Sequence, residues 1–285
     1  MDLYRRWIAH ILVYLLAWLP VSCLRAEIIT LEMEQGLIAT AEYLQGDEDA
    51  PALLIQHGFL QTREFITVRR LADSLHESGY TILLPNLTLG ISARQQSLSC
   101  EAIHTHSMSQ DTREIARWVD WLHQQTNNKL YLIGHSSGSL QLIAYLNAYP
   151  DAPITGGILI SLIPYGESPA SHETAADRLR AKHAQRWDPV SLETYGLVYC
   201  KDYLTTPGNY LSYVSWDPPS TLATLEHLAF PITIVLGGTD RRLSKDWRKR
   251  LQTIGVKIIT VEGTNHFFDH EHEFDLLDAI EGLLK

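Results

Sequence analysis

The 285-residue sequence has only three cysteines, and its basic residues are fewer than its acidic ones. Three cysteines cannot build a disulfide-dense scaffold or a four-thiolate zinc site. The 23 lysines and arginines against 33 aspartates and glutamates give a formal net charge of −10. This charge argues against a nucleic-acid-binding protein, which needs a positive field to displace phosphate counterions. A composition that is 45% hydrophobic and 20% charged also excludes disorder and fibrous repeats, so we expect an acidic globular protein.

A hydrophobic run occupies the N-terminus. Arg5 and Arg6 precede an apolar stretch over about residues 8–19, and small residues follow up to Ala26. This order is typical of a secretory signal peptide, and the run is shorter than the roughly 20 residues of a membrane-spanning helix. We therefore expect a signal peptide over residues 1–26 and export to the periplasm or the exterior. An uncleaved N-terminal anchor that keeps the protein at the membrane, or a lipid anchor on Cys23, is the alternative.

Short apolar segments alternate with amphipathic ones over residues 27–285. Residues 53–55 are wholly apolar, as in a strand buried on both faces, and residues 65–79 carry apolar side chains at three- and four-residue steps, as in a helix. The same patterns predict a strand pair at 27–45, strands at 80–84, 129–133, 154–163, 231–236 and 256–261, and helices at 110–125, 138–149, 244–254 and from 271. Such alternation predicts one α/β domain with a mainly parallel sheet and helices on both faces.

Residues 165–226 interrupt this alternation. The segment is rich in tyrosine and tryptophan and contains two helix-like stretches without a clear buried strand. Tyr195, Tyr199 and Tyr203 are four residues apart, a spacing that would place them on one helix face. We expect a helical lid inserted before the penultimate strand, over the carboxyl edge of the sheet, where open α/β proteins bind ligands. Its aromatic residues would either contact an apolar or aryl substrate group or form the lid's own core.

The segment Gly134–Gly138 fits the pattern G-x-S-x-G between a predicted strand and a predicted helix. A turn this tight holds its serine in a strained conformation and projects the hydroxyl above the sheet, and the flanking glycines leave room for the turn. A serine hydroxyl also needs a base to take its proton. Ser136 is therefore the predicted nucleophile.

The base and the acid are predicted from chain order. His266 follows the last predicted strand, and Asp240 follows the strand before it. The order Ser136, Asp240, His266 is the one that the G-x-S-x-G turn predicts. Asp240 would hold the tautomer of the histidine and stabilise its protonated form.

An oxyanion hole needs two N–H donors. The residue after the nucleophile, Ser137, supplies one of them. The other is expected from Phe59, in the loop that closes the strand at 53–56. His57 in that loop is expected to support its structure and not to act as a base.

These motifs resemble those of the α/β-hydrolase superfamily, in its serine esterase and lipase branch with a lid insertion. The resemblance covers residues 50–285 and rests on Gly134–Gly138, His57-Gly58 before Phe59, Gly238–Asp240 and Asn265–Phe267. It implies a serine hydrolase that cleaves small-molecule carboxylic esters through an acyl-enzyme intermediate, without a cofactor. One departure from the family is the lack of the glycine-rich oxyanion loop of many esterases, which puts acceptance of bulky alcohol groups in doubt.

Export also bears on the cysteines. Once Cys23 is removed or lipidated, Cys100 and Cys200 are the remaining pair, and an oxidising compartment would allow a disulfide. Two separate buried thiols are the alternative. No metal site is expected, because the pairs His104/His106 and His270/His272 each lack a third ligand nearby.

Other activities fit the same triad. A thioesterase, a peptidase or an acyltransferase would use the same three residues, because fold alone does not decide the reaction. A non-catalytic binding protein, or a membrane-tethered accessory protein, that keeps the hydrolase fold is the alternative from another class.

Overall fold

The computed structural model describes residues 26–269 and 272–284. The expected signal peptide or anchor therefore lies outside the described residues, apart from Ala26. Within those two ranges, no helix has the length and apolar character needed to cross a membrane.

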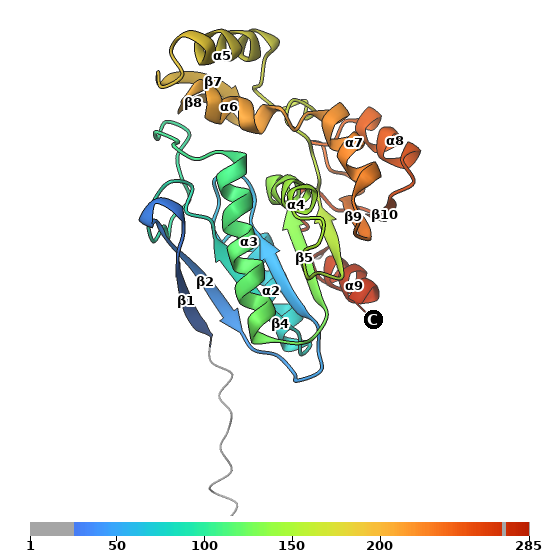
Figure 1. Cartoon of the computed structure of the whole chain (residues 1–285). Helices are drawn as coiled ribbons and strands as arrows, with labels where there is room; N and C mark the ends of the chain where they lie inside the picture. Colours follow the sequence, from blue (N-terminus) through green and yellow to red (C-terminus); the bar gives the residue numbers. More distant parts are fainter. Residues whose placement is uncertain (1–25, 270–271, 285) are drawn as a thin grey trace, which may run out of the picture.

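The described residues form a central sheet in the order β1-β2-β4-β3-β5-β6-β9-β10 (Figure 1). Strand β2 is antiparallel to both of its neighbours, and every pairing from β4 to β10 is parallel, which confirms the predicted mainly parallel sheet. The bounds are β1 (Glu27–Glu32), β2 (Ile38–Leu44), β3 (Ala52–Gln56), β4 (Thr81–Asn86), β5 (Leu130–His135), β6 (Gly156–Ile160), β9 (Ile232–Gly237) and β10 (Lys257–Val261), with a 3-10 turn η1 (Glu34–Gly36) between β1 and β2.

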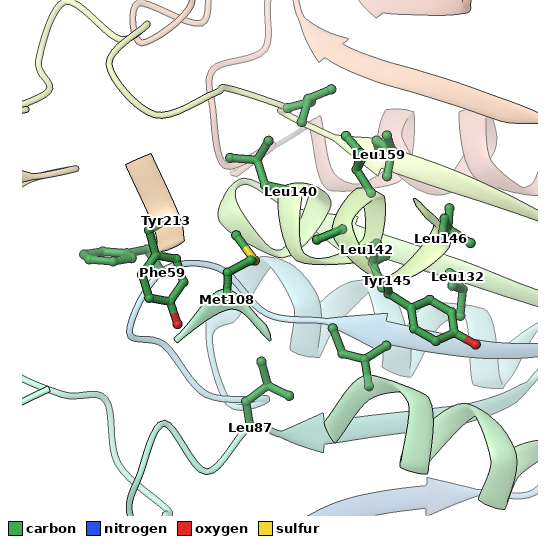
Figure 2. Packing of buried hydrophobic residues seen from close by; sticks show 14 of the residues in the cluster. Phe59, Leu87, Met108, Leu132, Leu140, Leu142, Tyr145, Leu146, Leu159 and Tyr213 are labelled. Atoms are coloured by element: carbon green, nitrogen blue, oxygen red, sulfur yellow. The ribbon is translucent and has the colours of Figure 1, made fainter. Parts of the chain in front are cut away.

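Helices cover both faces of the sheet, as predicted. Successive side chains of a strand point to opposite faces. Accordingly, Leu53 and Ile55 of β3 pack in one apolar cluster with α2 and α9, whereas Leu54 packs in a second cluster with α3 and α4. Figure 2 shows the second cluster around α4, where Leu142 and Leu146 lie near Leu132 of β5. The helices of the sheet layers are α2 (Ile66–Glu77), α3 (Met108–Gln125), α4 (Ser137–Ala148), α8 (Lys245–Thr253) and α9 (Glu273–Leu284).

Residues 161–231 connect β6 to β9, and we call them the cap segment. They include the predicted insertion at 165–226. Figure 1 shows α5, α6 and the β7–β8 pair grouped at one end of the central sheet. The elements of the cap segment are α5 (Ala175–Trp187), β7 (Glu193–Leu197), β8 (Cys200–Thr205), α6 (Pro207–Val214) and α7 (Pro218–His227).

The insertion contains helices, as expected, but it also contains two strands, which the expectation of a helical lid missed. Strands β7 and β8 form an antiparallel hairpin, with Tyr195 directly opposite Tyr203. The tyrosines at four-residue spacing therefore do not share a helix face. Tyr195 lies on β7, Tyr203 lies on β8, and the chain reverses at Val198 and Tyr199. Both paired tyrosines are buried, since residues opposite each other in a hairpin lie on one face.

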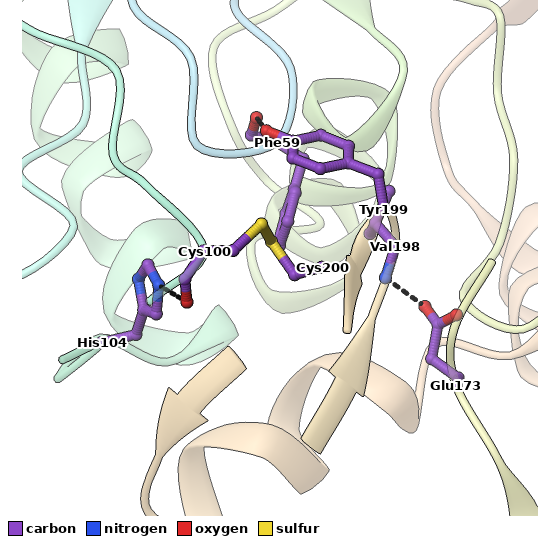
Figure 3. The surroundings of a disulfide bond; sticks show 7 residues. All are labelled: Phe59, Cys100, His104, Glu173, Val198, Tyr199 and Cys200. Atoms are coloured by element: carbon purple, nitrogen blue, oxygen red, sulfur yellow. Dashed lines mark hydrogen bonds between the residues drawn. A yellow bond between two sulfur atoms is a disulfide. The ribbon is translucent and has the colours of Figure 1, made fainter. Parts of the chain in front are cut away.

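A disulfide joins Cys100 to Cys200, as predicted from the cysteine count and export (Figure 3). It connects the loop between β4 and α3 to the first residue of β8. Beside it, the N–H of His104 donates to the carbonyl of Leu204 at 2.8 Å. The hairpin of the cap segment is therefore attached both covalently and by hydrogen bonding to the main domain.

Candidate active site

Ser136 stands at a sharp turn between β5 and α4. Its backbone angles are φ 56° and ψ −122°, a conformation that a residue with a side chain rarely adopts. Strand β5 ends at His135 and α4 begins at Ser137. The strand, the turn and the helix therefore follow the order that the G-x-S-x-G pattern predicts.

The two glycines of this turn are required by close approach of backbones. A Cβ on Gly134 would lie 2.7 Å from the N of Ser139, and a Cβ on Gly138 would lie 2.5 Å from the O of His57. Real Cβ atoms do not come this near to backbone atoms. Glycine at these positions lets α4 pass directly beside β5 and the loop after β3.

The structure brings Ser136, Asp240 and His266 together. The hydroxyl of Ser136 lies 3.0 Å from Nε2 of His266, and Nδ1 of His266 lies 2.8 Å from Oδ2 of Asp240. The side chains of the aspartate and the histidine are both buried. A nucleophile, a base and an acid that orients the base would be connected by the same chain of hydrogen bonds.

Two further residues hold the backbone of His266, and the sequence patterns did not identify them. Nε2–H of His135 donates to the carbonyl of His266 at 3.0 Å, and the hydroxyl of Ser161 donates to the same oxygen at 2.8 Å. Burial, together with the charge of His266, lowers the pKa of His135 to about 3, so this side chain is neutral. The only sequence signal for His135 was its place inside the G-x-S-x-G segment.

The loop after β3 lies beside the nucleophile. A Cβ on Gly58 would be 3.6 Å from the Cβ of Ser136. Nδ1–H of His57 donates to the carbonyl of Gly58 at 2.9 Å, and the N–H of Leu87 donates to Nε2 of His57 at 3.3 Å. Burial, and then the charge of Arg94, lowers the pKa of His57 to about 3, which keeps the ring neutral. His57 thus supports the loop.

These contacts bear on the predicted oxyanion donors. In a trans peptide the C=O and the next N–H point in opposite directions, so the bond from His57 to Gly58 also fixes the direction of the Phe59 N–H. Ser137 is the first residue of α4, and the first N–H groups of a helix have no acceptor within it. Ser137 directly follows Ser136 in the chain, and Phe59 lines the larger cavity together with Ser136.

The turn of the β7–β8 hairpin covers the loop after β3. The hydroxyl of Tyr199 donates to the carbonyl of Phe59 at 3.2 Å, and the two rings meet edge to face at 5.4 Å (Figure 3). Val198 has a φ of 52°, a strained value for a β-branched residue. Its N–H donates to Oε1 of Glu173 at 3.0 Å. The tip of the hairpin is therefore held from two sides.

Two cavities in the described part of the chain meet at Ser136. The larger has a volume of about 130 Å³ and aromatic walls, and the smaller has a volume of about 40 Å³, room for roughly one water molecule. Ser136, Val198, Arg242 and His266 line both of them.

The tyrosines of the cap segment fill the two expected roles and a third. Tyr195 stacks on Tyr210 at 4.3 Å, and both are buried within the cap segment. Tyr165 lines the smaller cavity, and Tyr199 lines the larger one. Tyr203 and Tyr213 instead contact His106 of the main domain. The aromatic residues therefore serve the segment's own core, its attachment to the main domain and the lining of the site.

His104 and His106, which were considered as metal ligands in the sequence, contact a tyrosine of the cap segment. His104 stacks on Tyr203 at 4.0 Å, and Nε2 of His106 lies 3.2 Å from the hydroxyl of Tyr203. His270 lies outside the described residues. Across residues 26–269 and 272–284, no three His, Cys, Asp or Glu side chains group as metal ligands.

Comparisons with known proteins identify the fold. The family model described as alpha/beta hydrolase fold matches residues 51–194, which is about half of the chain. No curated protein sequence matches the chain.

Solved structures of the same fold cover nearly the whole chain. The alpha/beta hydrolase GrgF from Penicillium sp. sh18 has a TM-score of 0.70 at 15% identity, covering 92% of this chain and 98% of that one. Est1E from Butyrivibrio proteoclasticus, also solved with bound ferulic acid, has a TM-score of 0.64 at 17% identity, covering 90% and 96%. A soluble variant of monoglyceride lipase from Saccharomyces cerevisiae, in complex with a substrate analogue, has a TM-score of 0.67 at 14% identity, covering 93% and 96%. The chain therefore belongs to the alpha/beta hydrolase fold family.

Proposed function

We propose that this protein is an exported serine hydrolase that cleaves small-molecule carboxylic esters through an acyl-enzyme intermediate. The observation that carries the proposal is the continuous hydrogen-bond chain from Asp240 through His266 to the strained Ser136. A non-catalytic protein has no need of a serine, a histidine and an aspartate that are hydrogen-bonded in this order.

In the proposed reaction, Oγ of Ser136 attacks the ester carbonyl while Nε2 of His266 takes the hydroxyl proton. The amides of Phe59 and Ser137 stabilise the resulting oxyanion, an effect of about 3–4 kcal/mol per donor in comparable sites. The intermediate then collapses, and His266 gives its proton to the oxygen of the leaving alcohol. A water molecule repeats these steps on the acyl-serine and releases the carboxylic acid.

Two further observations support parts of the proposal. The structural neighbours include Est1E, solved with ferulic acid, and a monoglyceride lipase in complex with a substrate analogue, which favours small-molecule ester substrates. The Cys100–Cys200 disulfide favours export, because disulfides persist mainly in oxidising compartments.

Turnover of 4-nitrophenyl butyrate and of its thioester counterpart tests the proposed activity. Ser136→Ala should lower kcat by about 10⁴-fold or more, because triad residues act as one unit. Ser78→Ala is the matched control, since Ser78 lies at the end of α2 and lines neither cavity. Faster turnover of the thioester would replace the esterase assignment by a thioesterase, and undiminished turnover by Ser136→Ala would refute both.

A further inference from the structure

Arg242 places a positive charge at the catalytic serine. It follows Asp240 by two residues, and its side chain lines both cavities that meet at Ser136. The guanidinium carbon lies 4.9 Å from the ring centroid of Phe267. The triad does not use this charge, although it stands beside the reacting atoms.

The guanidinium of Arg242 forms no hydrogen bond and no ion pair with any of the described residues. Two other partly buried arginines, one in the cap segment and one in α8, are paired with carboxylates. Arg178 lies 3.4 Å from a carboxylate oxygen of Asp217, and Arg250 lies 2.6 Å from one of Glu167. Arg242 is partly buried, and burial of a charge without a partner costs free energy. An anion bound beside its guanidinium would offset that cost.

The larger cavity suits an apolar group that carries an anion. Phe59, Phe65 and Phe267 supply apolar walls, and Arg242 is the one arginine, lysine or carboxylate residue in the lining. His135 in the same lining is neutral, because burial lowers its pKa to about 3. A ligand in this cavity therefore meets a positive charge beside aromatic rings.

Glu173 does not neutralise this charge. It lines only the smaller cavity, where its Oε1 accepts the N–H of Val198. Burial raises the pKa of Glu173, and the cation that opposes this rise is Arg178. Glu173 is therefore engaged with the backbone of Val198 and with Arg178, and it leaves the Arg242 guanidinium to the cavities.

We propose that Arg242 binds a carboxylate carried by the ester substrate itself, an inference that rests on the proposed function. The scissile carbonyl would lie at Ser136 while the guanidinium donates hydrogen bonds to the second, ionised carboxyl group of the substrate. Guanidinium groups bind carboxylates through two parallel hydrogen bonds, which gives both charge and shape selectivity. The substrate class is then a monoester of a dicarboxylic acid, or an ester whose alcohol part bears a carboxylate.

Two pairs of synthetic esters test this selectivity. In one pair the acyl chain ends in a carboxylate or its amide (4-nitrophenyl monoadipate and 4-nitrophenyl adipamate). In the other the leaving group carries it (4-carboxyphenyl butyrate and 4-carbamoylphenyl butyrate). Arg242→Gln should lower the acid-to-amide ratio of kcat/KM by about 10- to 100-fold in at least one pair.

Matched variants complete the design. Arg241→Gln should keep the wild-type ratio, because Arg241 is exposed and lines neither cavity. Arg242→Lys should recover part of the ratio, since a lysine keeps the charge without the planar fork. A drop in the first pair places the carboxylate on the acyl side, and a drop in the second places it on the alcohol side. An unchanged ratio in both pairs would overturn the inference.

A binding measurement separates this inference from the proposed function. In a Ser136→Ala background, calorimetry should show 4-phenylbutyrate binding at least about 10-fold more tightly than 4-phenylbutyramide. Adding Arg242→Gln should abolish that difference. Equal binding of the acid and the amide would overturn the inference. Arg242-dependent binding by a wild-type protein that hydrolyses no ester would refute the proposed function instead.

Discussion

The hydroxyl of Tyr199 lies 3.2 Å from the backbone oxygen of Phe59. This contact joins the tip of the cap hairpin to the residue whose N–H we assign to the oxyanion hole. Cys200, the next residue, is bonded to Cys100 in the main domain. The position of the hairpin and the geometry of the oxyanion loop are therefore coupled through one short stretch of chain.

Loss of the Tyr199 hydroxyl should weaken catalysis modestly. Tyr199→Phe removes one neutral hydrogen bond, worth about 1 kcal/mol, so kcat/KM should fall by about fivefold if the bond helps to hold the oxyanion loop. Tyr149→Phe is the control, because Tyr149 lies at the far end of α4. Identical kinetics in both variants would show that the contact with Phe59 does not affect the reaction.

Removal of the disulfide should destabilise the fold. The two cysteines are 100 residues apart in sequence, and closing a loop of that size is worth about 4–5 kcal/mol in the chain-entropy model. Urea denaturation of Cys100→Ala/Cys200→Ala beside the wild type, each with and without reductant, measures the loss. The wild type in reductant should approach the variant. Equal midpoints for all four samples would contradict a stabilising role.

The alternating pattern of apolar segments predicted the sheet and its helices because each of these elements buries a continuous apolar run or stripe. The grouping of Ser136, Asp240 and His266 was predictable for a related reason. Ser136 lies in a local motif, and the parallel order of strands brings the ends of β5, β9 and β10 to one edge.

The β7–β8 hairpin was not predictable in this way. Its strands are five and six residues long, and Lys201 and Asp202 are exposed within the second one. No apolar run marks them as strands, and the tyrosine spacing fits a helix equally well. The hydrogen bond from His135 to the carbonyl of His266 was also not predictable, because it joins residues 131 positions apart and its acceptor is a backbone oxygen.

Acid should destabilise the protein through buried neutral histidines. Burial lowers the pKa of both His57 and His135 to about 3, whereas the unfolded chain has the ordinary value of 6.5. Below pH 6.5 the unfolded state therefore binds protons that the folded state does not, and the free energy of unfolding falls as the pH drops toward 3. Each histidine contributes about 1.4 kcal/mol per pH unit to this slope.

Urea titrations between pH 4 and 7 check that slope. His57→Asn should be shallower than the wild type by about 1.4 kcal/mol per pH unit. His123→Asn should match the wild type, because His123 is exposed on α3. A wild-type slope in His57→Asn would mean that His57 titrates normally in the folded protein.

The glycines should differ sharply in their tolerance of a methyl group. Gly138→Ala places a Cβ 2.5 Å from the backbone oxygen of His57, so the nucleophile turn must distort and activity should be lost. Gly282→Ala meets nothing within 4 Å, and on α9 it should stabilise the protein by about 0.5–1 kcal/mol. Thermal melts and ester turnover of both variants test the pair. An active Gly138→Ala enzyme would contradict the tight packing at the turn.

The most direct test of the proposed function is covalent labelling of the mature protein with a fluorophosphonate, measured by intact mass and peptide mapping. A fluorophosphonate reacts with a serine that is activated by a neighbouring base, and the hydroxyl of Ser136 lies 3.0 Å from Nε2 of His266. The wild type should gain one adduct on Ser136, Asp240→Asn should react much more slowly, and Ser136→Ala should gain none. A folded wild-type protein that stays unlabelled, or a Ser136→Ala variant that is labelled equally, would contradict the assignment of Ser136 as a catalytic nucleophile.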